Sequence, residues 1–219
     1  IDAKKMTVLP NLVPPMVPSL PRAELRSKYG YKQDDWILIS VAAWNRHHKR
    51  IDYLIEETAK IDDQSVKLII CGQPEPDAEY LKSLAASKLG ERARFITAAE
   101  NEVADLLGLA DVFVLCSLYE GLGAVVIEAA MTGLPVICHP HDGSKFIVQD
   151  DYWLADLSVE GGLSKRLLQW RQEPPDPQRL SGLKSMVESR FSETRVSTEF
   201  EKMVQQVAGS GKSASGLFN

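Results

Sequence analysis

Short apolar segments alternate with amphipathic segments along most of this chain, and this alternation restricts the fold more than any other feature. The apolar runs are short and rich in branched aliphatic residues, and they cover residues 36–43, 66–72, 93–97, 111–117 and 135–139. The segments between them have the apolar spacing or the terminal glycine of helices and cover residues 50–61, 77–90, 100–110 and 123–133. Such alternation is typical of a parallel sheet covered by helices on both faces. We therefore predict an α/β fold with a doubly wound, Rossmann-like sheet.

The two ends of the chain depart from this pattern. Residues 152–155 would add a short sixth strand, and helices are expected at about 161–171, 176–190 and 193–208. Prolines are frequent in residues 1–21, so we expect an interdomain linker or an arm there. We expect one domain over residues 22–208 and a disordered Gly/Ser-rich tail over residues 209–219. Because the chain opens on a linker, we expect it to be one domain of a two-domain protein.

Composition excludes several classes of protein. The 219 residues are 44% hydrophobic and 25% charged, which is ordinary for a globular protein. No apolar run approaches the ~20 residues that a membrane helix needs. The net charge of −5 argues against a nucleic-acid partner. Cys71, Cys116 and Cys138 each follow an apolar run, and an odd number of buried thiols favours a reducing, cytoplasmic location.

A glycine turn follows the strand predicted over residues 111–117. Gly121 and Gly123 lie in the sequence SLYEGLGAVVIEAAMTGLPVI, between that strand and the next helix. Ligands of open parallel sheets bind beyond the carboxyl ends of the strands, and the first amides of a helix attract anions. The turn therefore predicts a phosphate site, with a tight turn that binds no ligand as the alternative.

Two glutamates flank this turn. Glu120 would repel a phosphate, so we expect it to project past the phosphates towards a neutral group rich in hydroxyls. Glu128 stands among apolar helix residues, where a carboxylate without a partner is costly, and it could accept hydrogen bonds from a ribose diol. The alternative is that Glu128 is a solvated helix residue. An anion site between two such carboxylates indicates a nucleotide-sugar pocket.

A basic loop follows the first predicted strand, in a chain that is acidic overall. Residues 46–50 read RHHKR and stand at the start of a predicted helix, where cations oppose the helix dipole. This placement predicts a bound anion, and a solvated basic loop is the alternative. His139 and His141 have no third ligand in view, so we predict no metal site there.

The segment 119–137 resembles the E-x7-E segment of the retaining glycosyltransferases of family 4, which have the GT-B fold. The sequences VLPNLV, ADVFVLCS and RFSETRVSTEFEKM are similar to other segments of that family, so the resemblance covers most of residues 7–207. It implies that the chain is the C-terminal, donor-binding domain of a two-domain enzyme.

The resemblance also implies roles for individual residues. Glu120 would be the catalytic residue beside the donor sugar, and Glu128 would accept the ribose hydroxyls. The base would lie against Thr97 and Ala98. Backbone amides of the turn would meet the diphosphate or sugar, at Gly121, Leu122, Gly123, Ala124 and Val125.

Two cations of the basic loop are expected to bind the donor diphosphate. Lys49 matches the lysine of the family, whereas the position of the usual arginine holds Ala43. We therefore expect Arg46 to take over the role of that arginine. Lys49, Arg46 and the helix N-terminus would offset the charge of the leaving diphosphate, so we expect no metal and no cofactor.

The expected reaction transfers a sugar from a nucleotide diphosphate sugar to an acceptor hydroxyl, with retention of the anomeric configuration. UDP is the nucleotide that we expect in the donor. The residues specify neither the base nor the sugar. The acceptor would be a glycan, a lipid or another hydroxyl compound held by the other domain, which could also contact a membrane surface. The isolated domain should therefore be inactive.

Two other functions remain open at this stage. The chain could belong to a sugar-nucleotide epimerase of the same architecture, or to a non-catalytic module that binds a nucleotide or a polysaccharide. A dinucleotide oxidoreductase is discounted, because no G-x-G-x-x-G follows the first strand.

Overall fold

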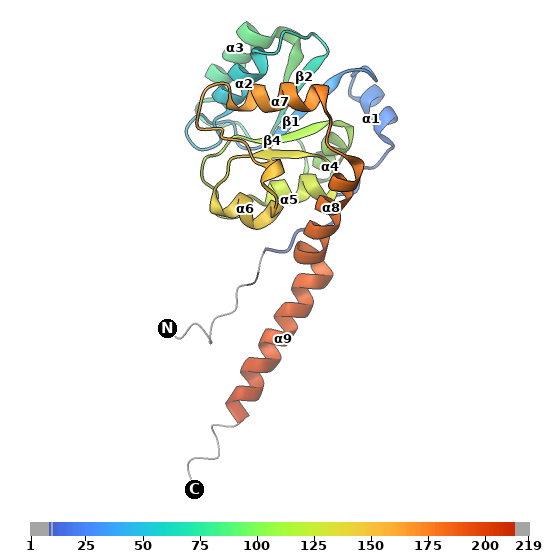
Figure 1. The fold of residues 1–219 in the computed structure, drawn as a ribbon, viewed down its shortest axis with the longest axis vertical. Helices are drawn as coiled ribbons and strands as arrows, with labels where there is room; N and C mark the ends of the chain where they lie inside the picture. The colour runs from blue at the N-terminus through green and yellow to red at the C-terminus, as the bar shows by residue number, and fades with distance from the viewer. Residues whose placement is uncertain (1–8, 10, 213–219) are drawn as a thin grey trace.

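A computed structural model describes residue 9 and residues 11–212 of the chain (Figure 1). Its centre is a five-stranded parallel sheet of order β3-β2-β1-β4-β5. The strands are β1 Trp36–Val41, β2 Val66–Cys71, β3 Ala93–Ile96, β4 Val112–Leu115 and β5 Val136–Cys138. The direction of winding reverses between β1 and β4, and ligands of such sheets bind where the carboxyl ends of those strands separate.

The strands form where the sequence is continuously apolar. Every residue of β4 and β5 is buried, as are four of the six residues of β1. Ile39 of β1 pairs with Phe113 of β4, and neither side chain is exposed. Burial on both faces of the sheet explains why these strands do not alternate between polar and apolar residues.

Helices cover both faces of the sheet, as the alternating pattern predicts (Figure 1). The helix α2 packs against α3 and α7, while α5 packs against α6 and α8 and α1 packs against α4. The bounds are α1 Arg22–Lys28, α2 Ile51–Ala59, α3 Ala78–Leu89, α4 Glu100–Leu109, α5 Ala124–Met131, α6 Asp142–Val148, α7 Gly162–Gln172, α8 Pro177–Phe191 and α9 Glu193–Lys212. The doubly wound α/β fold is confirmed.

The predicted sixth strand is wrong. Residues Asp151–Trp153 form a 3-10 helix, η3, and only Leu154 makes a single parallel bridge, to Cys138 of β5. Aromatic packing explains the apolar pattern without a strand, because the Trp153 ring lies edge-on against Tyr152 and Trp170. Sequence reasoning also missed the seven-residue helices α1 and α6.

Both ends of the chain differ in detail from the expected boundaries. Described residues before α1 run along the domain, where the Val13 amide donates to the Phe191 carbonyl at 3.1 Å and the Ser19 amide donates to Asp105 at 2.7 Å. The last helix, α9, projects away from the sheet and continues to Lys212, four residues into the predicted tail (Figure 1). Residues 1–8, 10 and 213–219, which include parts of the predicted linker and tail, lie outside the described residues.

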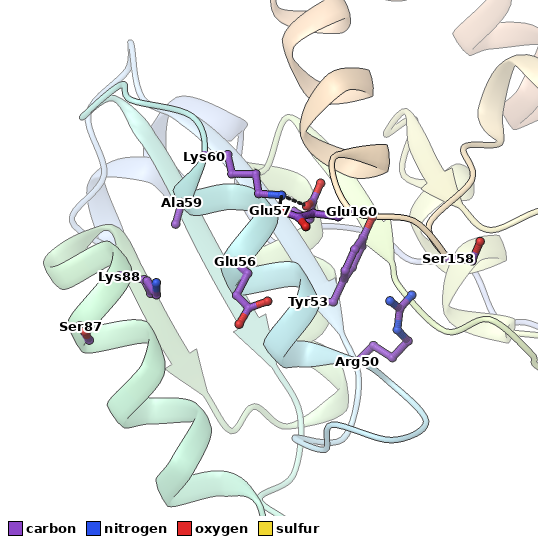
Figure 2. Close-up of a pocket in the computed structure, with 10 residues that line it drawn as sticks. All are labelled: Arg50, Tyr53, Glu56, Glu57, Ala59, Lys60, Ser87, Lys88, Ser158 and Glu160. Atoms are coloured by element: carbon purple, nitrogen blue, oxygen red, sulfur yellow. Dashed lines mark hydrogen bonds and ion pairs between the residues drawn. The ribbon is translucent and has the colours of Figure 1, made fainter.

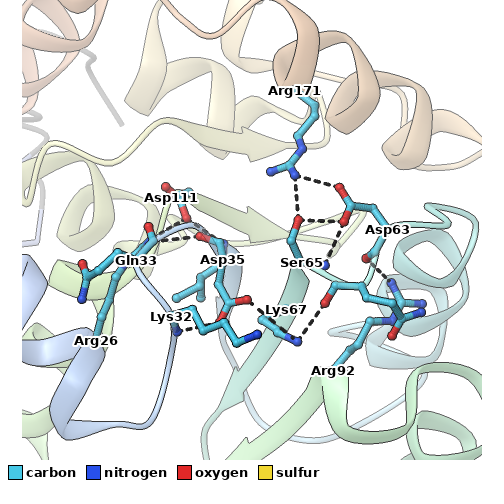
Figure 3. A network of polar contacts seen from close by, with 12 residues as sticks. Arg26, Lys32, Gln33, Asp35, Asp63, Ser65, Lys67, Arg92, Asp111 and Arg171 are labelled. Atoms are coloured by element: carbon cyan, nitrogen blue, oxygen red, sulfur yellow. Dashed lines mark hydrogen bonds and ion pairs between the residues drawn. The ribbon is translucent and has the colours of Figure 1, made fainter.

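Charged side chains link the amino ends of the strands (Figure 3). The guanidinium of Arg26 donates to the carbonyls of Leu109, Gln33 and Asp35 and to the Asp111 carboxylate. Asp111 also accepts the backbone N–H of Ile37, the second residue of β1, at 2.7 Å. We call this group the amino-end network; its other members are Lys32, Gln33, Asp35, Asp63, Ser65, Lys67, Arg92 and Arg171.

Candidate functional site

The loops that follow β1 and β4 meet at the point where the winding of the sheet reverses. The Lys49 Nζ lies 2.5 Å from the Glu120 Oε1, although 71 residues separate them in the sequence. The His48 Nε2 lies 3.1 Å from the Tyr119 carbonyl oxygen and 3.6 Å from the Glu120 Oε2. The basic loop and the glycine turn, which were singled out separately in the sequence, are therefore in direct contact.

Asn45 shapes the basic loop. Its Oδ1 accepts the backbone N–H groups of His48 and Lys49 at 3.1 and 2.7 Å. Its Nδ2 donates to Glu75 at 2.9 Å, which joins this loop to the one after β2. A side-chain oxygen that binds successive backbone amides stabilises a turn, so Asn45 fixes the backbone from which Lys49 projects.

The Glu120 carboxylate is ionised at neutral pH. Its side chain is only 9% exposed, and burial alone raises its pKa. The hydrogen bond from Lys49 and the positive charge of Lys49 outweigh burial, so the pKa of Glu120 lies below its ordinary value of 4.5. The Lys49 ammonium thus keeps the Glu120 carboxylate charged in a half-enclosed position.

The glycine turn leads into α5 without a side-chain cap. Gly123 precedes the helix in the left-handed region, with φ 77°, a conformation that glycine adopts without strain. Because Gly123 has no side chain, the first amides of α5 remain available to an external acceptor. Gly143 of α6 allows the turn to lie close against α6, because a Cβ at that position would be only 3.0 Å from the Gly121 carbonyl oxygen.

Arg46 does not join Lys49 at the turn. Its Nε lies 3.3 Å from the Asp52 carboxylate, and its guanidinium stacks over the Tyr80 ring at 4.3 Å. Its backbone N–H donates to Asp77 at 3.0 Å. These contacts hold Arg46 against α2 and α3, so the structure brings only one of the two expected cations to Glu120.

The remaining predicted residues lie on neighbouring elements. Glu128 is half-buried on α5, and Leu122, Ala124 and Val125 are half-buried at its start. Thr97 follows β3 and donates to the Gly72 carbonyl at 3.2 Å, and Ala98 follows it. Since β3 is separated from β4 by β2 and β1, the predicted base region and the glycine turn stand at opposite sides of the carboxyl edge.

The two histidines after β5 stabilise the surrounding backbone. The His139 Nδ1 accepts the Leu157 N–H at 3.2 Å, and the His141 Nδ1 accepts the Ser144 N–H at 3.3 Å. Burial lowers the pKa of both rings, so they are neutral at pH 7. Within the part of the chain that the structure describes, no three His, Cys, Asp or Glu side chains are grouped to hold a metal ion.

Arg50 is a residue of this region that sequence reasoning did not select. Its guanidinium donates to the carbonyls of Cys116 and Leu157 and stacks over the Tyr53 ring at 4.2 Å. It also lines a cavity of about 680 Å³ beside α2, α3 and the start of α7, away from the glycine turn (Figure 2). Nothing in the sequence RHHKR distinguishes Arg50 from its basic neighbours.

The glycine turn and the Lys49–Glu120 ion pair lie where the winding of the sheet reverses, which is where ligands of such sheets bind. The fold and the site therefore define an α/β protein whose ligand site could hold a phosphate group. The chain belongs to the family of glycosyl transferases group 1, whose pattern it matches over residues 21–182.

Curated relatives agree with this assignment. The putative glycosyltransferase EpsD of Bacillus subtilis is 29% identical over 188 residues, which cover 84% of this chain and 49% of that protein. The UDP-Gal:alpha-D-GlcNAc-diphosphoundecaprenol alpha-1,3-galactosyltransferase of Escherichia coli is 26% identical over 161 residues, covering 69% and 41%. The chain therefore spans about half the length of these relatives.

Solved structures confirm the fold. Sucrose-phosphate synthase from Thermosynechococcus elongatus superposes with a TM-score of 0.79 at 22% identity, covering 93% of this chain and 53% of that one. HepE of Anabaena, solved in complex with UDP-glucose, gives a TM-score of 0.78 at 18% identity, covering 93% and 57%. These are glycosyltransferases of the GT-B type, so the sheet described above has the architecture of that class.

Among the described residues, no helix combines the length and apolar character needed to cross a membrane.

Proposed function

We propose that this chain is the donor-binding domain of a retaining glycosyltransferase of family 4, which transfers a sugar from a nucleotide diphosphate sugar to an acceptor hydroxyl. The observation that carries the proposal is the contact of Lys49 with Glu120 beside the uncapped start of α5. A cation, a carboxylate and free helix amides together match a ligand with an anionic part and a hydroxyl-rich part.

The ion pair gives Lys49 and Glu120 linked roles. Without donor, each neutralises the other in a position that is largely shielded from water. A diphosphate at the start of α5 offers Lys49 a second anionic partner, and the Glu120 carboxylate then accepts hydrogen bonds from the sugar hydroxyls. In the transferring complex Lys49 and the helix amides offset charge on the leaving diphosphate.

Names of the compared proteins support a uridine nucleotide as the first donor to test. The Escherichia coli relative is named for UDP-Gal, and HepE was solved with UDP and glucose and with UDP-glucose. For this chain, we assign the ribose to Glu128 and the base to the loop at Thr97 and Ala98, as the family resemblance implies. Metal-free transfer, a cytoplasmic location and the identity of the acceptor stay predictions.

A thermal-shift panel tests the proposal. A ligand that binds only the folded chain raises its unfolding midpoint by mass action, by an amount set by its concentration relative to Kd. We expect nucleoside diphosphates and their sugars to raise the midpoint of the chain, with free nucleosides and pyrophosphate weaker at equal concentration. A panel in which no nucleoside diphosphate shifts the midpoint would contradict the proposal.

A further inference from the structure

Arg50 adopts a backbone conformation that its side chain disfavours. Its φ is 52°, and among the described residues only Gln149 shares a positive φ without being glycine. A Cβ makes this left-handed region costly, and residues held there gather at functional sites because surrounding contacts compensate for the strain. A glycine at position 50 would remove the strain, so the contacts that surround Arg50 must compensate for it.

The guanidinium joins two loops at the carboxyl edge of the sheet. Its Nη1 donates to the Cys116 carbonyl at 3.4 Å, immediately after β4, and to the Leu157 carbonyl in the loop after η3. Cys116 leads into the segment that contains Glu120. The Leu157 N–H in turn donates to the His139 Nδ1. One side chain from the start of α2 therefore joins the backbone that precedes the glycine turn to the loop after η3.

The rest of α2 anchors the same loop at a greater distance from the turn. The Tyr53 hydroxyl donates to the Val159 carbonyl at 2.9 Å. The Glu57 carboxylate, 1% exposed, accepts the Gly161 N–H at 2.8 Å and both the N–H and the hydroxyl of Ser164 at 3.0 Å. Since these contacts already hold the loop on α2, the particular effect of Arg50 is on Cys116 and the turn that follows it.

We propose that Arg50 is a positioning residue for the donor site: it holds the segment 116–123 in the geometry that presents Glu120 and the first α5 amides to the nucleotide diphosphate. This inference rests on the proposed function of that turn. The contacts of Arg50 with two carbonyls assign it a role in the arrangement of the loops, in contrast with Lys49, which faces the carboxylate directly.

The matched variants Arg50→Gly and Gln149→Gly test the inference. Both remove a left-handed non-glycine residue, but only the first removes the loop contacts. We expect Gln149→Gly to bind UDP as the original chain does, and Arg50→Gly to bind it about fivefold or more weakly in calorimetry, the value of one lost hydrogen bond. Backbone hydrogen exchange without ligand should become faster at residues 117–123 in Arg50→Gly alone.

A third variant separates the two contacts from the positive charge. Arg50→Lys keeps the charge but has no planar group to reach two carbonyls, so its UDP affinity should fall between those of the original chain and Arg50→Gly. Unchanged UDP affinity in Arg50→Gly, or weaker binding with unchanged exchange at residues 117–123, would overturn the inference. If the original chain bound no nucleoside diphosphate, the proposed function would fail, while the exchange comparison would still decide whether Arg50 holds the turn.

Discussion

The two edges of one sheet use charged residues in opposite ways. At the amino ends of the strands, Arg26 is 3% exposed, and four hydrogen bonds to three carbonyls and Asp111 use most of its five N–H donors (Figure 3). At the carboxyl ends, Lys49 and Glu120 have mainly one another, and Arg50 is strained. Charged groups whose hydrogen bonds are nearly all made within the protein hold the strands together. Charged groups with unused hydrogen-bonding capacity can instead exchange partners with a ligand.

This contrast predicts that stability and ligand affinity depend on different edges. A substitution in the amino-end network should change the free energy of unfolding and leave nucleotide affinity of the folded chain unchanged. A substitution at the carboxyl edge should change nucleotide affinity and alter the free energy of unfolding only slightly. The predictions below run from the largest expected effect to the smallest.

Arg26→Met should lower the free energy of unfolding by about 3 kcal/mol, because it leaves several buried carbonyls without their donor and removes a buried cation from Asp111, which keeps only Arg22 and the Ile37 N–H. Urea unfolding measures the change. The matched control is Arg179→Met, which breaks an exposed pair with Asp150 and should cost under about 1 kcal/mol. If the two variants lost similar amounts of unfolding free energy, the amino-end network would stabilise the fold no more than an exposed ion pair does.

Glu128→Gln should weaken UDP binding by about tenfold or more and leave pyrophosphate binding unchanged. The carboxylate is proposed to accept ribose hydroxyls, and a hydrogen bond to a charged group contributes about 1.5–3 kcal/mol. Calorimetry with both ligands tests this, because pyrophosphate has no ribose. Equal weakening of the two ligands would remove Glu128 from the ribose site.

Lys49→Ala should weaken UDP binding by about tenfold, through loss of a charge-assisted contact with the diphosphate. Arg46→Ala, its matched control, should weaken UDP binding by less than about threefold, because Arg46 is held by Asp52 and Tyr80. Uridine binding should respond to neither change, and UDP affinity of the original chain should fall as salt rises. Equal effects of the two substitutions would mean that Arg46 leaves Asp52 and joins the diphosphate.

Glu120→Gln should change stability slightly, and in a pH-dependent way. The folded pKa of Glu120 lies below 4.5, so its charged form contributes stability above about pH 4.5, and this contribution is lost as pH falls through the folded pKa. The original chain should exceed the variant by under about 1 kcal/mol near pH 7, with the gap closing on acidification. Denaturant unfolding at several pH values measures the gap, and a gap that widens below pH 4.5 would contradict the pairing with Lys49.

Much of the fold could be predicted from the sequence because buried parallel strands are continuously apolar. β4 and β5 are buried at every position, and Gly72 and Gly133 mark points where the chain must turn. Short helices left no such pattern. α1 has a single buried leucine, and α6 carries a glycine at its second position, so neither has a readable apolar stripe.

The site was predictable in its location and less so in its partners. The carboxyl edge placed Lys49 and Glu120 near one another, because loops after neighbouring parallel strands meet at one edge. The sequence could not reveal that Asp52 and Tyr80 hold Arg46, since those contacts depend on how α2 and α3 pack. Nor could it reveal Arg50, whose role depends on carbonyls of residues 66 and 107 positions away.

The most direct test is a hydrogen-exchange comparison of the chain with and without saturating UDP. Our account predicts that UDP slows exchange at the amides of residues 122–125, with smaller effects near Lys49, and leaves the amino-end network and the cavity between α2 and α3 unchanged. Protection confined to the amino ends of the strands or to that cavity would contradict the account, because the nucleotide would then bind away from the Lys49–Glu120 pair.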